Sequence, residues 1–272
     1  MAIAHGREGR AVPASGGRLD DARRWRDVLL TLVFAGMKAR YGRGSTRLVK
    51  WLFDPFAAVG VYLLLVSLIL DRGGEAPGLS IACAVVAFQI VMMAVVNSIG
   101  AIRDRASILL NMGFQRMLIP VTTTLTETLA FASSLVLLAL MMALYGIGPT
   151  PSILWFPLVL GINILFAAAC AYPITLIGLW YEDMRPFVVS LARTMFFLAP
   201  SLVPLSEVTG TVSELVKLNP LTGLFEGYRD ALLYGQAPAA WELLYPLAFS
   251  IALLALFVPL FRREQAHFAK LI

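Results

Sequence analysis

The chain has 272 residues, of which 59% are hydrophobic and only 14% are charged, and its mean hydropathy is +0.78. Soluble domains are about 45–50% apolar and about 25% charged, so this composition excludes an ordinary soluble enzyme as well as a disordered or fibrous chain. The apolar runs are continuous instead of alternating with polar residues, which argues against a membrane β-barrel. The sequence therefore predicts an all-α polytopic membrane protein.

The positive charges are concentrated at the N-terminus. The net charge is +5, and 11 of the 22 Lys and Arg residues precede position 51. This distribution is typical of a cytoplasmic N-terminus under the positive-inside rule and argues against a nucleic-acid partner. The two cysteines, Cys83 and Cys170, lie inside apolar runs and are interpreted as packing residues.

The first 50 residues divide into two parts. Residues 1–21 are rich in Gly, Ala and Arg without periodicity, which predicts a disordered cytoplasmic tail. Residues 22–50 place apolar side chains at helical spacing opposite polar ones and end in a basic stretch, which predicts an amphipathic interface helix. The remaining residues, 51–272, are predicted to form one six-span transmembrane domain.

Six apolar runs approach the length of about 20 residues that a membrane-spanning helix needs. They lie at 51–70, 79–100, 118–144, 152–180, 187–205 and 243–261. With the N-terminus inside, the cytoplasmic segments carry 18 Lys and Arg residues and the outer segments carry three. The predicted protein is therefore a multi-pass protein of the cytoplasmic (inner) membrane, with both termini in the cytoplasm.

Two connecting segments have helical character of their own. Residues 101–117 mix charged and apolar side chains, which predicts a short helix across the cytoplasmic face. Residues 206–241 are too apolar for a free loop. In them Thr211 and Glu214 have the spacing of a capping box, and Asn219-Pro220 is a helix start. Two short re-entrant helices on the outer side, between spans 5 and 6, fit this pattern.

The chain lacks the motifs of an enzyme. It has no phosphate-binding loop of the G-x-x-x-x-G-K-[ST] type and no G-x-S-x-G nucleophile motif. His5 and His267 lie in opposite tails without metal-ligand spacing. We therefore expect no catalytic residue, no metal site and no cofactor in this chain.

The order of these parts resembles the ABC-2 type transporter permeases, in the branch that exports lipid-linked polysaccharides and polyol phosphates (O-antigen, capsule, teichoic acid, galactan). At 47–50 the chain has Arg-Leu-Val-Lys where the family commonly has a leucine-glycine pair. The resemblance spans about residues 22–272 and rests on the sequential order of Arg40-Tyr41-Gly42-Arg43-Gly44-Ser45, Trp51, Pro55, Asn111-Met112-Gly113-Phe114-Gln115-Arg116, Pro120, Asn219-Pro220, Tyr228-Arg229, Gly235, Phe261-Arg262-Arg263-Glu264 and Phe268-Ala269.

The resemblance implies a homodimer in which the polymer passes between the protomers. Two copies of a cytoplasmic ABC ATPase subunit would dock on it and hold the ATP and Mg. The segment 101–117 would be the coupling helix, with Arg103, Asp104, Arg105, Leu109, Leu110 and Phe114 as the coupling residues. The segment 206–241 would be an extracytoplasmic gate that includes Asn219, Pro220, Phe225, Tyr228 and Arg229.

Glu127 and Arg193 are the candidates for charged groups in a substrate pathway. Each is the only deep charge of its predicted span, and a charge inside a membrane is a functional candidate by default. Their similar depths predict an ion pair with each other. The alternative for Arg193 is a side chain that reaches back to the cytoplasmic headgroups.

The other pathway candidates are hydroxyl and aromatic side chains that suit a sugar chain: Thr123, Thr124, Phe131, Tyr172 and Phe196. The structural alternative is that the threonines bond back to their own helix and that the aromatic rings pack between helices. Three basic residues, Lys38, Arg40 and Arg43, are candidates to receive an anionic lipid headgroup as it enters the pathway. The alternative is that they are ordinary cytoplasmic charges of the kind that the positive-inside rule describes.

The predicted function is the membrane subunit of an ATP-driven exporter of a lipid-linked polysaccharide. Two alternatives remain at this point. A permease of the same family exporting a drug, an antibiotic or a lipid would have the same architecture. A membrane assembly or scaffold protein would have no transport pathway.

Overall fold

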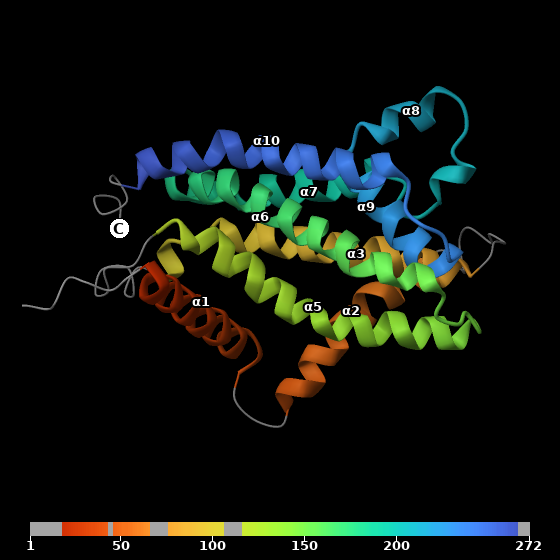
Figure 1. Ribbon diagram of the computed structural model, residues 1–272, viewed down its shortest axis with the longest axis horizontal. Helices are drawn as coiled ribbons and strands as arrows, with labels where there is room; N and C mark the ends of the chain where they lie inside the picture. The colour runs from red at the N-terminus through yellow and green to blue at the C-terminus, as the bar shows by residue number, and fades with distance from the viewer. Residues whose placement is uncertain (1–17, 43–45, 66–75, 106–115, 266–272) are drawn as a thin grey trace, which may run out of the picture.

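The computed structural model describes residues 18–42, 46–65, 76–105 and 116–265. This part of the chain is all-helical and contains no strand. In chain order (Figure 1), its elements are α1 Arg18–Tyr41, α2 Thr46–Leu65, α3 Pro77–Ser98, η2 Arg103–Arg105, α5 Leu118–Leu144, η3 Pro151–Trp155, α6 Phe156–Trp180, η4 Glu182–Met184, α7 Arg185–Leu198, η5 Leu205–Glu207, α8 Thr211–Lys217, α9 Pro220–Arg229, the π-helical η6 Asp230–Tyr234 and α10 Ala240–Glu264.

Four helical segments among the described residues are long and apolar enough to cross a membrane: α3, α5, α6 with η3, and α10. They coincide with four of the six predicted runs and confirm a helical multi-pass membrane protein. The other two runs differ. Helix α2 has 20 residues but carries Arg47, Lys50 and Asp54 in its first half. Helix α7 has 14 residues, which is about 21 Å against a hydrocarbon core of about 30 Å.

Helix α3 is the centre of the bundle. In its most apolar stretch 78% of the residues are buried, against 11% for α10. Helices α2, α5, α6, α7 and α9 all contact it. Small and β-branched residues make up most of α3, including Ala82, Ala84 and Ala87, so neighbouring helices approach it closely. Helix α10 packs mainly on α6 and α9 at the outside of the bundle.

Helix α6 approaches the end of α3 very closely. A Cβ atom on Gly178 would lie 2.0 Å from the carbonyl oxygen of Ile99, which no side chain tolerates. Deeper in the bundle Asn163 of α6 donates to the carbonyl of Ala87 at 3.0 Å. Glycine at 178 is therefore a requirement of helix packing.

At one end of the bundle, residues next to the helix termini contact one another. Arg103, after α3, donates to the carbonyl of Leu179 at the end of α6, at 3.4 Å. Arg116, before α5, donates to the carbonyl of Gln265 after α10. Helix α1 begins at this same end (Figure 1), while α8, α9 and η6 lie at the opposite end.

The predicted interface helix 22–50 is divided between two helices. Gly42 has a positive φ of 74° and donates its N–H to the carbonyl of Lys38 at 2.9 Å, which ends α1 in the left-handed conformation that favours glycine. Helix α2 then begins at Thr46 with a different direction (Figure 1).

The segment 206–241 contains the two predicted short helices, α8 and α9. Asn219 caps α9 by accepting from the N–H of Leu221 at 3.0 Å, with Pro220 at the first helical position, as predicted. The capping box predicted at Thr211 is wrong. Gly210, with φ 71°, occupies the position before α8, and no side chain caps this helix. Because the turn needs a positive φ, glycine takes the cap position and the helix begins one residue nearer the N-terminus than predicted.

We expect Gly178→Ala to lower the yield of folded protein in detergent, because the new methyl group would push α6 away from α3. Gly161→Ala in the same helix is the matched control, since a Cβ there meets open space and alanine favours helix. Size-exclusion profiles and melting temperatures of both variants measure the effect. Equal behaviour of the two would contradict the close approach.

Candidate functional site: a polar pocket and an exposed helix face

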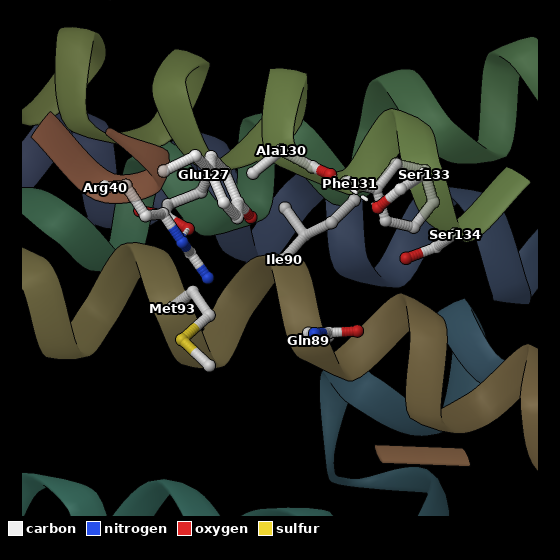
Figure 2. Close-up of a pocket in the computed structure, with 10 residues that line it drawn as sticks. Arg40, Gln89, Ile90, Met93, Glu127, Ala130, Phe131, Ser133 and Ser134 are labelled. Carbon is white, nitrogen blue, oxygen red and sulfur yellow. Dashed lines mark hydrogen bonds and ion pairs between the residues drawn. The ribbon is translucent and has the colours of Figure 1, made fainter. Parts of the chain in front are cut away.

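A pocket opens between α1, α3 and α5 (Figure 2). The volume that water-sized molecules can occupy in it is about 20 Å³. Polar side chains from three helices share it with apolar ones, and the Oε1 atom of Gln89 is buried there without a hydrogen-bond partner among the described residues. The lining residues are Arg40, Tyr41, Gln89, Ile90, Met93, Glu127, Ala130, Phe131, Ser133 and Ser134.

Glu127 is held by two donors from different helices. Arg40 of α1 forms an ion pair with one carboxylate oxygen, and Asn97 of α3 donates to the other at 2.7 Å. The Glu127 side chain is only 5% exposed. A buried charge without partners is very unfavourable, so these two bonds explain how a carboxylate is accommodated at this position.

Arg40 can reach Glu127 because α1 packs closely against α5. Gly36 faces Thr126, where a Cβ would approach the threonine side chain to 2.9 Å. One turn further, the indole N–H of Trp51 in α2 donates to the carbonyl of Ala130 at 2.8 Å. A short stretch of α5 therefore anchors both α1 and α2.

The predicted ion pair between Glu127 and Arg193 is wrong. Glu127 is engaged by Arg40 and Asn97, while Arg193 is exposed on α7. The depth estimate failed because α5 has 27 residues, or about 40 Å. It exceeds a hydrocarbon core of about 30 Å, so counting residues from one end of the helix does not fix the depth of Glu127.

Helix α7 has two different faces. Phe196 is buried and packs on Phe88 and Phe225, with ring centroids 4.6 and 5.8 Å apart. The other face is exposed and carries Phe187, Ser190, Arg193, Thr194 and Phe197 together with the apolar Leu191 and Leu198. A cation and two hydroxyls between aromatic rings are an unusual composition for a surface that meets lipid.

The remaining pathway candidates are buried at separate places. The hydroxyls of Thr123 and Thr124 both donate to carbonyls of their own helix at 3.0 Å. Phe131 lines the pocket beside Glu127. Tyr172 donates to the carbonyl of Met117 at 3.1 Å and meets Phe261 edge-on, at the end where α6 and α10 terminate.

The basic and coupling candidates are only partly described. Lys38 is exposed, whereas Arg40 is engaged by Glu127. Arg103, Asp104 and Arg105 form the short helix η2, in which Asp104 is exposed. The other candidates, Arg43, Leu109, Leu110 and Phe114, lie outside the described residues.

The predicted gate residues form a buried network at the opposite end. Arg229 has no exposed surface and donates to Glu226 at 2.6 Å, to the carbonyls of Pro200 and Ser201 at 2.8 Å, and to that of Ser80 at 3.3 Å. Asn219 donates to the carbonyl of Met195 at 2.6 Å. These bonds join α9 to the end of α7 and to the start of α3.

The aromatic gate candidates complete this network. Phe225 and Tyr228 are fully buried, and the hydroxyl of Tyr228 accepts from Asn163 of α6 at 3.0 Å. Sequence reasoning missed Asn97, Asn163 and Glu226. The signal was available for each, because a polar side chain inside an apolar run or an apolar helix face needs a partner.

These features define the class: a helical multi-pass membrane protein with a polar pocket inside the bundle and one exposed polar helix face. No protein-family model matches the chain. It is similar to an O-antigen export system permease protein RfbA of Myxococcus xanthus, with 28% identity over 251 residues, which is 91% of this chain and 96% of the relative. Two O-antigen export system permease proteins RfbA of Klebsiella pneumoniae are 21% and 20% identical over 248 residues, 90% of this chain and 95% of each relative.

The similarity extends over nearly the whole length of each relative and of this chain. It confirms the resemblance to the ABC-2 type polysaccharide permeases that the order of the short motifs predicted. The relatives are named as permease proteins of an export system.

A double-mutant cycle tests the contact between Arg40 and Glu127. We expect Arg40→Gln and Glu127→Gln to be coupled in stability by roughly 0.5–3 kcal/mol, as residues in one ion-pair network are. Unfolding of the purified protein in detergent measures the free energies. The control cycle combines Glu127→Gln with Arg193→Gln, for which the expected coupling is zero. If the control cycle showed coupling and the first cycle showed none, Glu127 would pair with Arg193 and not with Arg40.

Proposed function

We propose that the chain is the transmembrane subunit of an ATP-driven exporter that moves a lipid-linked polysaccharide of the O-antigen type out of the cytoplasm. The observation that carries the proposal is the similarity to O-antigen export system permeases over 90–91% of the chain. The helical bundle, with its pocket and exposed polar helix face, is compatible with a pathway along the protein.

The topology that we propose has six crossings. Helices α6 and α10 both end where α3 ends, as the contacts of Arg103 and Arg116 indicate. The chain must therefore return to the opposite end between them, and α7 with the residues up to Ser201, which Arg229 binds, provides that return. Helix α3 starts at the far end from the start of α1 (Figure 1), so we assign the first crossing to the part of the chain that contains α2.

The exposed face of α7 is our candidate for the pathway wall. Exposing the Arg193 cation to lipid would cost a few kcal/mol on insertion scales, whereas a water-filled pathway solvates it. Phe187 and Phe197 on the same face offer flat surfaces for sugar rings. Arg193 carries the charge that an anionic lipid-phosphate link would meet.

We further propose that two copies of the chain form the pathway between their α7 faces and that each copy binds one ABC ATPase subunit at the end that carries η2. In this arrangement both termini are cytoplasmic and α8 and α9 are outside. ATP and Mg belong to the partner subunit. The segment 101–117 supplies the contact with the ATPase.

Export itself is tested in cells. Deleting the gene should remove the surface polysaccharide while its lipid-linked form accumulates inside. Arg193→Ala should fold normally and lower export about tenfold, equivalent to about 1.4 kcal/mol. Arg185→Ala, an exposed residue at the start of α7, is the control and should export normally. A deletion strain with unchanged surface polysaccharide would favour a drug or lipid exporter or a scaffold protein instead.

The sidedness is tested with single cysteines in a chain whose Cys83 and Cys170 are replaced by alanine. A membrane-impermeant maleimide added to intact cells should label cysteine at Ser213 or Ala237. It should not label cysteine at Asp183, in the turn between α6 and α7, until the membrane is opened. The reverse pattern would invert the topology.

A further inference from the structure

Gln89 of α3 carries a buried polar atom that the functions proposed above do not use. The Oε1 atom of its amide is buried and has no hydrogen-bond partner among the described residues. Leaving a buried polar atom unbonded is unfavourable, and nearly all such atoms in proteins have a partner. Exchanging the oxygen and the nitrogen of the amide would place a donor there instead, so the position requires a partner in either orientation.

The register of α3 and α5 places Ser134 opposite Gln89. The two helices run antiparallel, because Asn97 near the end of α3 donates to Glu127 of α5 at 2.7 Å, and a backbone N–H in the first turn of α3 donates to the tyrosine that follows α5 at 3.2 Å. Gln89 lies eight residues before Asn97, and Ser134 lies seven residues after Glu127. At a rise of about 1.5 Å per residue these offsets are about 12 and about 10.5 Å, so the two side chains lie at the same level of the bundle.

Gln89 and Ser134 both line the pocket between α1, α3 and α5. In Figure 2 the Ser134 hydroxyl points from α5 toward α3, on the side where the amide oxygen of Gln89 lies. No hydrogen bond joins this oxygen directly to the hydroxyl. The neighbouring hydroxyl of Ser133 already donates to the carbonyl of Ala130 at 3.0 Å, so Ser134 is the serine that can donate into the pocket.

The size and the charge of the pocket decide which molecule can lie between the two side chains. Water-sized molecules can occupy about 20 Å³ of it, and one buried water needs at least about 10–15 Å³ measured in this way. A sugar ring or a lipid headgroup is too large for this space. A metal cation is disfavoured, because the guanidinium of Arg40 lines the same pocket and neutralises Glu127.

We propose that the pocket binds one water molecule, which donates to the Oε1 atom of Gln89 and accepts a hydrogen bond from the hydroxyl of Ser134. A bridge through a bound water is enthalpically nearly as good as a direct hydrogen bond. This bridge forms a second polar contact between α3 and α5, about two helical turns beyond the direct bond from Asn97 to Glu127. It depends on the packing of the bundle and not on the proposed export function.

Equilibrium unfolding of the full-length protein in detergent micelles tests the bridge through two substitutions. Methionine has nearly the length of glutamine and lacks its polar atoms, so Gln89→Met and Ser134→Ala should each lower the stability by breaking a hydrogen bond to the water. Their effects should be coupled by about twofold or more in the unfolding equilibrium constant, although the two side chains do not bond directly. Ser133→Ala is the matched control and should be additive with Gln89→Met.

A dry pocket gives the opposite result. Gln89→Met would then remove an unbonded polar atom and raise the stability, and its effect would be additive with that of Ser134→Ala. Either of these two observations would overturn the water site.

Radiolytic labelling of the full-length protein in lipid nanodiscs tests for the water itself. A short X-ray pulse converts water into hydroxyl radicals, which oxidise the side chains next to them. Phe131 lines the pocket and is only 6% exposed, whereas Phe225 is fully buried in α9. We expect mass spectrometry to find Phe131 oxidised and Phe225 unmodified in the wild type. The oxidation of Phe131 should be lost in Gln89→Met, because the water loses its acceptor.

The labelling contradicts the proposal if Phe131 is oxidised no more than Phe225 in the wild type. It also does so if the oxidation of Phe131 persists in Gln89→Met, because the radicals would then come from bulk water. If Gln89→Met fails to fold, Ser134→Ala provides the same labelling test, since it removes the donor to the water. These measurements need neither an ATPase nor a glycan, so their outcome is separate from that of the export assay.

Discussion

The buried guanidinium of Arg229 organises the extracytoplasmic end of the bundle as we propose it. A cation with no exposed surface is stable only when its donors are matched, and Glu226 with three backbone carbonyls matches them. Those carbonyls come from the start of α3 and from the residues after α7, and Glu226 in turn accepts from the N–H of Leu205. Removing any partner leaves a buried charge, so α9, α3 and the end of α7 are fixed together. If this end opens for a polymer, the Arg229 network moves as one body.

A second polar network, of Arg40, Asn97 and Glu127, fixes α1 against α5 and α3 nearer the other end. Between the two networks the described part of the bundle is mostly apolar. Asn163 donates to Tyr228 there, while Oδ1 of Asn163 and Oε1 of Gln89 are buried without a partner among the described residues. The polar residues on the exposed face of α7 differ from those of the two networks, because they are not buried between helices. The charges of the two networks are thus paired inside the protein, whereas the charge of Arg193 lies on the surface that we assign to the substrate.

Composition and periodicity predicted the all-α membrane class, four of the spanning helices and the α9 cap at Asn219, because these depend on residues near one another in sequence. The partner of Glu127 could not be predicted in the same way. Depth counted along one helix does not show which way a side chain points, and nothing local indicates that α1 packs on α5 through Gly36. Arg193 was a candidate because it is a charge within an apolar run, whereas its exposure depends on how α7 packs and could not be predicted from the sequence.

The most direct test of the central claim is transport by the purified complex of this chain and its ATPase subunits in proteoliposomes. With the lipid-linked glycan in the outer leaflet and the ATPase facing outward, addition of ATP should carry the glycan into the lumen, where added glycosidase no longer digests it. We expect protection only when both ATP and this chain are present. Full digestion under all conditions, despite ATP hydrolysis by the assembled complex, would contradict the assignment as a polysaccharide export permease.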